Sequence, residues 1–547
     1  MHKQVKSLLE NLINTEILSP LNIPPIDIPI ERPKNKDLGH FATPVAFVLT
    51  KILKQPPNVI ANEICQKLNK HEYFSEASQL NGYINLTLSA SFLDSLCASA
   101  LDGKYFIAQP QNNQRILLEY VSANPTGPLH IGHTRGAVFG DSLKRVGEFL
   151  GYDIVTEYYI NDAGAQITKL GRSVFMAQNN DYPQEWEEDC YRGEYIQNIA
   201  KEALGAFGAQ IFTDSHDTQA IATLSAFAKD LMLVEIQQNL ADLGISFDNF
   251  VSERAIFSQW QETLQILQNN DAVYENEGKI WLKSSQKGDE RDRVIVREDG
   301  DPTYLAGDIV YHRDKFLRKF NSYINIWGAD HHGYIARVKA SLEFLGYESK
   351  KLEILLSQMV SLLKNGAPYK MSKRAGTYIL VRDVVGEIGA DCLRFIFLTK
   401  KPDTHLEFDI HTLSQQDSNN PVFYINYANA RIHTLLGKSN LTQAQIAQSS
   451  IIEFLGQKDC TIAKDAQNLL FYALSIHQVI QSSFAQREMQ KICEYLRELA
   501  SLLHSFYNAH RILDNPHQTP ILKILLAVSQ SLSLGLSLLG IHAKTKM

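Results

Sequence analysis

The spacing of apolar residues predicts a small mixed domain at the start of the chain. Apolar side chains recur at helical spacing from Val5 to Ile13 and again over 58–68, as in helices with one buried face. Residues 82–88 alternate between apolar and polar, which is typical of a half-buried strand. A polar run at 109–114 then predicts a linker, so residues 1–110 are expected to form an α+β unit.

The middle of the chain changes to strands separated by a helix. An apolar strand at 116–121 leads through a loop rich in Pro and Gly into a helix from Ile131 to about Leu150, and a second strand covers 154–159. Strand, helix and strand in about 45 residues predict a parallel βαβ unit, an architecture typical of nucleotide-binding proteins.

The same region is expected to continue as one sheet with an insertion. Sheet-forming runs return at 294–296 and 324–327, and we expect both to complete the sheet of the βαβ unit. Residues from about 175 to 270 have a mostly helical pattern, which predicts an insertion. Residues 111–412 are therefore expected to form a parallel-sheet domain that is interrupted by helices.

Beyond Leu413 the pattern is helical throughout. Long stretches of helical periodicity cover 469–484, 489–507 and 521–539, and no run of any length alternates as a strand does. Residues 413–547 are expected to form an all-α helical bundle. The fold class predicted for the whole chain is therefore α/β multidomain.

Composition and charge narrow the class of protein. The chain has 547 residues, of which 44% are hydrophobic and 21% charged, a balance that is typical of a globular protein with several domains. Its net charge of −7 excludes a uniformly basic coat for nucleic acid, although a local basic face is compatible with it.

The cysteines and the first residues bear on the cellular location. The six cysteines stand singly, without a Cys-x-x-Cys pair, so we expect reduced thiols and no structural zinc. The start of the chain lacks the apolar core of a signal peptide, and no stretch approaches the length of a membrane span. We therefore expect a cytoplasmic protein that makes no contact with a membrane.

The loop between the first predicted strand and its helix holds the first candidate site, Ser122-Ala123-Asn124-Pro125-Thr126-Gly127-Pro128-Leu129-His130-Ile131-Gly132-His133. Loops at the carboxyl ends of parallel strands bind ligands, and a helix start offers unpaired N–H groups to phosphate. His130 and His133 can share one face there, while Gly132 leaves room for a flat base against the backbone. Taken alone, such a pair of histidines is more often structural than catalytic.

The second candidate is the basic loop Lys370-Met371-Ser372-Lys373-Arg374-Ala375-Gly376-Thr377. Cations placed beside an α-phosphate stabilise the negative charge that develops when ATP is attacked there. Without the first segment, a solvated basic turn would be the better interpretation. The two segments in this order, about 240 residues apart, favour ATP chemistry.

The two segments resemble the HIGH and KMSKS signatures of class I aminoacyl-tRNA synthetases. Arg374 stands where the class pattern has serine, and arginine followed by Ala-Gly resembles the arginine-specific branch. Further segments resemble arginyl-tRNA synthetases in particular: 119–127, 159–164, 303–309 and 327–333. The resemblance covers nearly the whole chain and implies a Rossmann-like catalytic domain with an insertion.

The resemblance implies which residues bind ATP. The catalytic residues would be His130, His133, Lys370 and Lys373. The remaining ATP contacts would come from both signatures and from the last of the four segments: Gly132, Met371, Ser372, Asp330 and His331. Taken singly, Asp330 and His331 fit a buried structural pair nearly as well. Some family members have glutamine before this aspartate, but this chain has Gly328-Ala329, so that contact to the amino acid is not implied.

The resemblance also implies an arginine pocket. A guanidinium is a planar fork of donors that pairs with carboxylates and a hydroxyl in its plane. Tyr304 and Asp308 would hold it, with Glu119 nearby, and their spacing of four residues places both on one face of a helix. The amino and carboxylate groups of arginine would be bound by Ser122, Asn124 and His133. Without the family, Tyr304 and Asp308 would be a pair on a helix surface.

Both ends of the chain resemble the tRNA-binding parts of the family. Residues 34–43 resemble the N-terminal domain that contacts the outer corner of tRNA, where Lys36, His40 and Phe41 could supply phosphate and stacking contacts. A structural loop around Phe41 explains these residues equally well. Residues 420–432 resemble the start of the anticodon-binding domain, which suggests Tyr424 and Arg431 as tRNA contacts.

These resemblances imply ATP-dependent attachment of L-arginine to tRNA(Arg) through an arginyl-adenylate. Mg²⁺ would accompany ATP, activation would usually need bound tRNA, and the enzyme would be a monomer. Three alternatives stay open: a class I synthetase for another amino acid, a nucleotidyltransferase on the same fold, and an inactive paralogue that only binds tRNA. The first two leave the carboxylate pocket and the bundle without a purpose. The third does not need the signature histidines and lysines.

Overall fold

The computed structural model describes residues 1–33, 35–106, 114–369, 379–457 and 459–547 of the chain. Its middle is built on a five-stranded sheet in the order β11-β10-β4-β5-β6, in which all neighbours run parallel. The strands are β4 (Arg115–Glu119), β5 (Asp153–Ile160), β6 (Asn249–Ser252), β10 (Ser322–Gly328) and β11 (Leu352–Ser357). β4 lies between β5, which follows it in the chain, and β10, which comes much later. The strand order changes direction at β4, so its carboxyl end is a topological switch point.

The predicted βαβ unit is confirmed as β4, α5 (Ile131–Phe149) and β5. Two glycines let α5 lie close to its neighbours. A Cβ atom added at Gly140 would come within 2.4 Å of the Tyr120 ring, and one at Gly147 within 2.2 Å of Ile154. The helix that follows β4 is therefore held tightly over the sheet, and this fixes the position of its first turn.

The prediction that 294–296 joins the main sheet is wrong. These residues lie in β9 (Arg293–Val296), which pairs antiparallel with β8 (Lys279–Leu282) in a separate sheet that also holds β7 (Val273–Asn276). The tight turn at Glu277-Gly278, with φ of 52° and 69°, forms a local hairpin of β7 and β8, and β9 adds to it. A short apolar run shows that a strand is buried but does not identify its partner.

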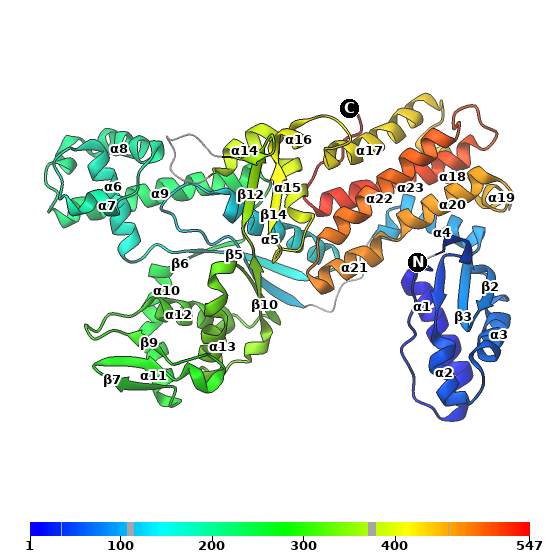
Figure 1. Cartoon of the computed structure of the whole chain (residues 1–547), viewed down its shortest axis with the longest axis horizontal. Coiled ribbons are helices and arrows are strands. Elements are labelled where there is room, and N and C mark those ends of the chain that lie inside the picture. The colour runs from blue at the N-terminus through cyan, green and yellow to red at the C-terminus, as the bar shows by residue number, and fades with distance from the viewer. Residues whose placement is uncertain (34, 107–113, 370–378, 458) are drawn as a thin grey trace.

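A helical insertion follows β5. Its helices are α6 (Ala165–Gln178), α7 (Glu185–Asp189), α8 (Glu194–Phe207) and α9 (Thr218–Asp242), and they enclose a hydrophobic core of their own. Figure 1 shows them projecting to one side of the sheet. The range of 175–270 that was expected to be helical also contains β6, which pairs with β5 in the main sheet. Four residues with a polar start give β6 no periodicity by which it could be recognised.

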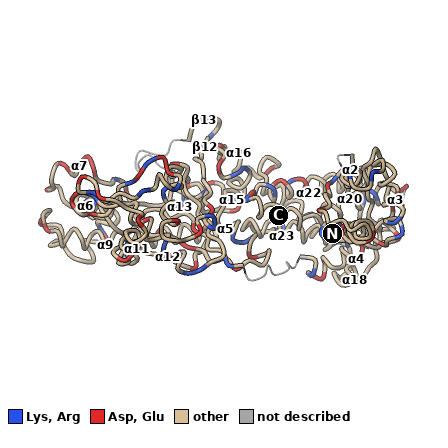
Figure 2. Tube along the Cα trace, turned by 90° about the horizontal axis from the view of Figure 1, so that it is seen from below, with Lys and Arg blue, Asp and Glu red and all other residues tan. Residues whose placement is uncertain are grey.

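Other elements surround the sheet. The chain continues from β6 through α10 (Glu253–Ile256), α11 (Trp260–Asn269), α12 (Tyr304–Leu317) and α13 (Ile335–Phe344). Later come a small sheet of β12 (Val360–Lys364), β13 (Ala367–Pro368) and β14 (Leu406–Asp409), and the helices α14 (Val381–Ile388), α15 (Ala390–Leu398) and α16 (Ile410–Ser414). Figure 2 shows acidic and basic residues interspersed along the whole molecule. The net negative charge is thus not gathered in one region.

The N-terminal part is an α+β unit that packs on the C-terminal bundle. Its strands β1 (Phe41–Thr43), β3 (Tyr83–Leu88) and β2 (Phe74–Leu80) form an antiparallel sheet. Its helices are α1 (His2–Glu10), α2 (Val45–Leu53), α3 (Pro57–Leu68) and α4 (Ala90–Leu101). Lys523 of the bundle forms an ion pair of 2.7 Å with Asp94 of α4. The cores of the two units join into one cluster.

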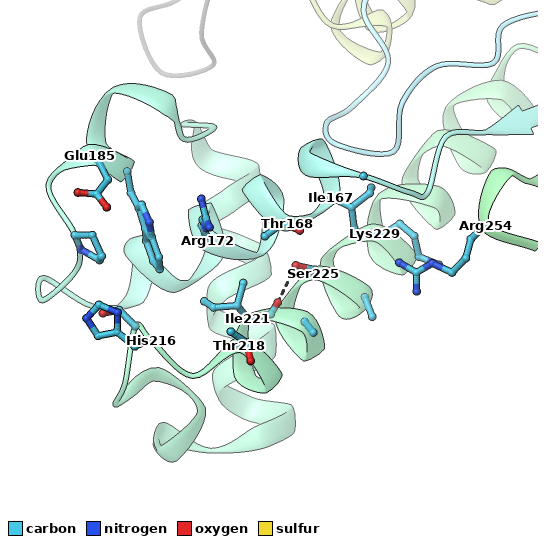
Figure 3. Close-up of a pocket in the computed structure, with 16 residues that line it drawn as sticks. Ile167, Thr168, Arg172, Glu185, His216, Thr218, Ile221, Ser225, Lys229 and Arg254 are labelled. Carbon is cyan, nitrogen blue, oxygen red and sulfur yellow. Dashed lines mark hydrogen bonds between the residues drawn. The ribbon is translucent and has the colours of Figure 1, made fainter. Parts of the chain in front are cut away.

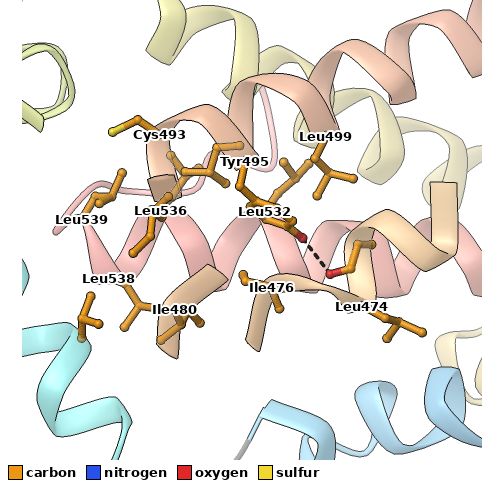
Figure 4. Close-up of a cluster of buried hydrophobic side chains, with 14 of the residues drawn as sticks. Leu474, Ile476, Ile480, Cys493, Tyr495, Leu499, Leu532, Leu536, Leu538 and Leu539 are labelled. Carbon is orange, nitrogen blue, oxygen red and sulfur yellow. Dashed lines mark hydrogen bonds between the residues drawn. The ribbon is translucent and has the colours of Figure 1, made fainter. Parts of the chain in front are cut away.

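The C-terminal part is all helical within the residues that the structure describes. It contains α17 (Pro421–Lys438), α18 (Gln443–Gln448), α19 (Ile452–Leu455), α20 (Thr461–Leu474), α21 (Ile476–Gln486), α22 (Gln490–Ala509) and α23 (Gln518–Leu538). Figure 4 shows the centre of the bundle, where Ile480, Leu499 and Leu532 are fully buried. The stretch expected as one helix over 469–484 is divided at Ser475.

Helix α23 is long and apolar enough to cross a membrane by length and composition alone. However, 72% of its most apolar window is buried inside the protein. It contacts α20 and α4 as well as its neighbours in the bundle. Its apolar surface is therefore explained by its place at the centre of the bundle.

Candidate functional site

The carboxyl end of the sheet borders a cavity of about 450 Å³. The cavity brings together eight residues that were predicted from the sequence: Glu119, Ser122, Asn124, His133, Tyr304, Asp308, Asp330 and His331. They come from the loop after β4, the start of α5, the first turns of α12 and the short helix η8 (Ala329–Tyr334) that follows β10. Segments nearly two hundred residues apart thus meet where the switch point places a ligand.

The chain turns sharply where β4 ends. Val121 has φ of 72° and Ser122 has φ of 43°, and the Ser122 N–H donates to the Tyr120 carbonyl at 3.1 Å. Positive φ is rare for a β-branched residue, so the turn is strained, as is common at binding sites. The turn directs the Ser122 hydroxyl back to Glu119, to whose Oε1 it donates at 2.9 Å. The same hydroxyl accepts from the Tyr159 N–H at 3.1 Å.

His130 and His133 are stacked at the start of α5, with ring centroids 3.6 Å apart. His130 caps the helix, because its Nδ1 accepts from the Gly132 N–H at 3.1 Å. Burial lowers the pKa of both imidazoles, and that of His133 to about 3, with His130 as a second cause. Both rings are therefore neutral near pH 7. His133 Nδ1 is buried and has no hydrogen-bond partner among the described residues.

Gly132 does not line the cavity. A Cβ atom at this position would lie 3.0 Å from the His130 ring, so the glycine makes room for the helix cap. The space that was predicted for a flat base is thus taken at this point by the His130 side chain. The structure gives Gly132 a role in holding the first histidine.

Glu119 is buried and forms an ion pair with Lys315. Lys315 is itself fully buried on α12, and it also donates to Asn325 Oδ1 at 2.8 Å. The sequence analysis did not single out Lys315. It stands seven residues after Asp308, which is the same helix face two turns further on, and a lysine at such a position among apolar residues is a recognisable signal.

Asp308 lies one helical turn after Tyr304 on α12, as its spacing predicted. Tyr304 is 57% exposed at the mouth of the cavity, whereas Asp308 lies deeper. Burial, with a smaller contribution from the charges of Glu253 and Glu119, raises the pKa of Asp308 to about 7, although the charges of Arg337 and Lys315 act in the opposite direction. No lysine or arginine in the described ranges forms an ion pair with Asp308. The cavity therefore carries an excess of negative charge at this end.

Asp330 and His331 stand at the mouth, with His331 Nε2 and Asp330 Oδ2 3.5 Å apart. Both side chains are more than half exposed, so the alternative of a buried structural pair is wrong. A Cβ atom at Gly328 would come within 2.4 Å of Asp330 Oδ1. The glycine that departs from the family pattern thus lets η8 begin with the aspartate close to the strand end.

Residues Lys370, Met371, Ser372 and Lys373 lie outside the described residues, and their predicted role stays a prediction. The first residue after them in the structure is tied to the histidine signature. Ile379 accepts from the Ile131 N–H at 2.9 Å, and Val381 donates to the Leu129 carbonyl at 3.1 Å. The chain that resumes at Ile379 is therefore attached directly to the start of α5.

His40 and Phe41 are buried, with exposed fractions of 7% and 1%. His40 Nδ1 accepts from the Leu88 N–H at 3.0 Å, and both rings pack against Phe471 of α20. Burial lowers the pKa of His40 to about 4. The predicted contact of these two residues with tRNA is wrong, because their side chains join the N-terminal unit to the bundle. The side chain of Lys36 is outside the described part of the structure.

Tyr424 and Arg431 lie on α17 beside α22. The Arg431 guanidinium is 3.6 Å from the centroid of the Tyr507 ring and donates to Asn508 Oδ1 at 3.3 Å. Tyr424 is half-buried against His504, whereas the neighbouring Tyr427 is well exposed. Arginine and aromatic rings thus share one face of the bundle, although Tyr424 contributes only its edge to it.

A second pocket of about 650 Å³ lies within the insertion (Figure 3). Its cations are Arg172 of α6, Lys229 of α9 and Arg254 of α10, and Arg172 lies 5.1 Å from the centroid of Trp186. Only one acidic residue, Glu185, lines it. Gln166, at the start of the same helix α6, lines the first cavity. A basic pocket therefore stands on the other side of α6 from the acidic one.

Comparisons with known proteins agree along the whole chain. Residues 1–88 match the family described as the arginyl tRNA synthetase N terminal domain, 97–409 that of the tRNA synthetases class I (R) catalytic domain, and 425–547 the DALR anticodon binding domain. The chain is 53% identical to the arginine–tRNA ligase of Wolinella succinogenes over all of both proteins. It is 50% identical to that of Helicobacter pylori strain Shi470 over all of this chain and 99% of the relative.

Solved structures show the same fold. A putative arginyl-tRNA synthetase of Campylobacter jejuni, 50% identical, superposes with a TM-score of 0.78 over 84% of this chain and 100% of its own. The arginyl-tRNA synthetase of Thermus thermophilus is 21% identical, with a TM-score of 0.75 over 99% of this chain and 100% of its own. The fold of nearly the whole chain is thus shared with the Thermus thermophilus structure, and that of most of the chain with the Campylobacter jejuni structure.

Proposed function

The chain belongs to the arginyl-tRNA synthetase family, and on that basis we propose that the cavity beside β4 is where arginine and ATP meet. The enzyme attaches arginine to tRNA in an ATP-dependent reaction. The observation that supports this position for the site is the excess of buried carboxylate at one end of a cavity whose other end carries His133 of the first signature.

The guanidinium of arginine binds at the acidic end. Asp308 forms no ion pair among the described residues, since Arg337 and Lys315 act on it only through their charge, and a guanidinium would pair with it in a planar, bidentate way. Tyr304 covers it from the mouth. Glu119 is already neutralised by Lys315, so it acts nearby and leaves Asp308 as the main anionic partner.

The amino and carboxylate groups of arginine lie towards α5. Asn124 and His133 line this side, and the Asn124 amide donates to Gln166 Oε1 at 2.7 Å, which holds its carbonyl oxygen in place as an acceptor. The Ser122 hydroxyl bridges Glu119 and the backbone of Tyr159. Its contribution is therefore to hold the turn and Glu119 as well as to contact the substrate.

ATP enters as its Mg²⁺ complex and binds across the start of α5. Neutral His130 and His133 can donate hydrogen bonds to phosphate beside the unpaired N–H groups of the helix start. Asp330 and His331 reach the ribose and adenine from the mouth, and Lys370 and Lys373 supply charge from the other side. Among the described residues, no three His, Cys, Asp or Glu side chains are placed to hold a metal ion.

The reaction proceeds in two displacements. An oxygen of the arginine carboxylate attacks the α-phosphorus in line, the bond to the bridging oxygen breaks, and pyrophosphate leaves. A hydroxyl of the terminal ribose of tRNA then attacks the arginyl carbonyl, and AMP leaves. Neither step needs a side-chain nucleophile, so the protein contributes position and charge stabilisation. As in the family resemblance, activation is expected to need bound tRNA.

The tRNA spans the length of the protein. Residues 413–547 bind the anticodon through the face of α17 and α22 that carries Arg431, and residues 1–110 contact the corner of the tRNA, where Lys36 remains a candidate. The basic insertion pocket of Figure 3 lies beside the arginine cavity and offers three cations to the phosphates of the acceptor strand. The enzyme works in the cytoplasm as a monomer.

The test is aminoacylation of total tRNA with each amino acid in turn. We expect charging with arginine only, and only in the presence of ATP. Charging with a different amino acid would favour a class I synthetase of another specificity. Binding of tRNA without any charging would favour the inactive paralogue.

A further inference from the structure

Tyr195, on the first turn of α8 in the insertion, has no role in the scheme above. Its ring packs against the hydrophobic core of the insertion. Its hydroxyl donates to the Thr126 carbonyl at 3.2 Å, in the loop that follows β4. A side chain of the insertion therefore reaches the loop that borders the arginine cavity.

The start of α8 determines where the Tyr195 ring lies. Gly193 precedes the helix with φ of 139°, a conformation that favours glycine. A Cβ atom at Gly193 would lie 3.2 Å from the Tyr195 ring, so a side chain there would crowd it. The glycine therefore leaves room for the ring beside the helix start, and the position of the ring fixes that of its hydroxyl.

The Thr126 peptide is connected directly to Asn124. The Thr126 N–H donates to the Asn124 carbonyl at 2.8 Å, while the Thr126 carbonyl accepts from Tyr195. Pro125 and Pro128 flank this part of the loop, and each restricts its own backbone φ. The Tyr195 hydroxyl therefore holds the part of the loop that the prolines leave free.

We propose that Tyr195 is a positioning residue of the arginine site, which acts through the Thr126 peptide to hold Asn124 against the amino and carboxylate end of the amino acid. Asn124 lines the cavity, and its side chain donates to Gln166 of α6. With Tyr195 fixing its backbone, the insertion holds Asn124 by both its side chain and its main chain. This inference rests on the proposed orientation of arginine in the cavity.

An analogue of arginine that lacks this end gives the sharpest discrimination. In the proposed orientation the guanidinium lies at Tyr304 and Asp308, which belong to α12 and not to the loop that carries Asn124. n-Butylguanidine has the guanidinium and the carbon chain of arginine but neither its amino nor its carboxylate group. Loss of the Tyr195 hydroxyl should therefore weaken the binding of arginine and leave that of butylguanidine unchanged.

The experiment measures aminoacylation by Tyr195→Phe, with n-butylguanidine as a competitive inhibitor of arginine. We expect KM for arginine to rise about tenfold, the order of one lost hydrogen bond, while the Ki of butylguanidine and KM for ATP change less than twofold. Tyr191→Phe is the matched control, because Tyr191 also packs on the insertion core but lies against Lys169, whose Nζ is 5.1 Å from the ring centroid. This control should change none of the three constants.

The double variant of Asn124→Ala and Tyr195→Phe tests the path of the effect. If Tyr195 acts through Asn124, the double variant should bind arginine no worse than Asn124→Ala alone, since both changes remove the same contact. Additive effects on arginine KM would overturn the inference. An equal rise of arginine KM and butylguanidine Ki in Tyr195→Phe would also overturn it, because a general loss of structure affects both ligands.

Asp308→Asn separates this inference from the proposed function, because it should raise both arginine KM and butylguanidine Ki. That result, together with a normal arginine KM in Tyr195→Phe, would overturn the inference and leave the cavity assigned to arginine. Unchanged constants in Asp308→Asn would overturn the proposed position of arginine and the inference that rests on it. Tyr195→Phe removes a single oxygen atom, so it tests the contact without creating a cavity in the insertion core.

Discussion

The interface between the middle region and the bundle and the cavity beside β4 both bury ionisable side chains, and they differ in how the charges are paired. Between the middle region and the bundle, Arg394 of α15 forms an ion pair of 2.5 Å with Asp141 of α5. Its other nitrogens donate to the carbonyls of Leu539 at 2.7 Å and Leu243 at 2.8 Å. In the cavity, by contrast, Asp308 forms no ion pair among the described residues, and Arg337 and Lys315 act on it only through their charge.

The difference distinguishes an ion pair that stabilises the fold from a cavity that binds a ligand. The paired arginine holds α15, α5 and the ends of α9 and α23 together, and its neighbour Gly540 has no room for a side chain, since a Cβ atom there would meet Arg394 at 2.2 Å. The charge of the Arg394 guanidinium is therefore balanced by groups within the protein. The cavity keeps an excess of negative charge that only a cationic ligand can balance, which is typical of a binding site.

The largest effect is expected at the paired site. Arg394→Ala would leave the buried Asp141 with Arg145, at 2.7 Å, as its remaining ionic partner, and breaking a buried pair in this way costs up to about 3–5 kcal/mol in the free energy of unfolding. Chemical denaturation would measure it. Arg511→Ala is the control, because Arg511 pairs with Asp514 at 2.8 Å on the surface and should contribute less than about 1 kcal/mol. Equal stability of the two variants would refute the structural role of the pair.

The next largest effect is expected for Lys373, whose positive charge is proposed to face ATP from the side opposite the histidine signature. Lys373→Ala should slow pyrophosphate exchange by about 10²–10³-fold, since a preorganised charge at the α-phosphate is lost. Its affinity for tRNA should change little, as measured by filter binding. Unchanged exchange would show that this lysine takes no part in adenylate formation.

A smaller effect is expected for the unpaired carboxylate. Asp308→Asn keeps the shape of the side chain but removes its charge, and it should raise KM for arginine about 100-fold, the order of a charge-assisted hydrogen bond. KM for ATP should stay within twofold. Asp314→Asn on the same helix is the matched control, because Asp314 pairs with Arg318 at 3.3 Å away from the cavity. Equal effects on arginine and ATP would argue against guanidinium recognition.

The smallest effect is a pH dependence of arginine binding. The pKa of Asp308 is raised to about 7, so its carboxylate is ionised above this pH and protonated below it. KM for arginine should therefore rise about tenfold from pH 8 to pH 6, and Asp308→Asn should flatten this dependence. A paired acid, whose pKa is lowered by folding, stabilises the fold as the pH rises. Asp308, whose pKa is raised, has the opposite effect on the free energy of unfolding. Because the unfolded carboxyl loses its proton near pH 4, Asp308 destabilises the fold above pH 7 and less so as the pH falls.

The sequence was informative where one segment was enough. The βαβ unit, the two signatures and the Tyr304–Asp308 spacing are all local patterns, and the structure places these elements as expected where it describes them. The resemblance to a family then predicted which of these residues bind ATP and arginine. The same local reasoning was wrong for His40 and Phe41, since a segment similar to a tRNA-binding loop gives no sign of the Phe471 ring that covers it from α20.

What the sequence by itself determined is therefore the class of reaction, the order of the elements and eight of the residues that line the cavity. Only the tertiary structure decided that β9 leaves the main sheet, that β6 joins it, and that Lys315 neutralises Glu119. The reason is physical. Periodicity shows that one face of an element is buried, whereas the partner of a buried charge is chosen by contacts between segments that lie hundreds of residues apart in the sequence.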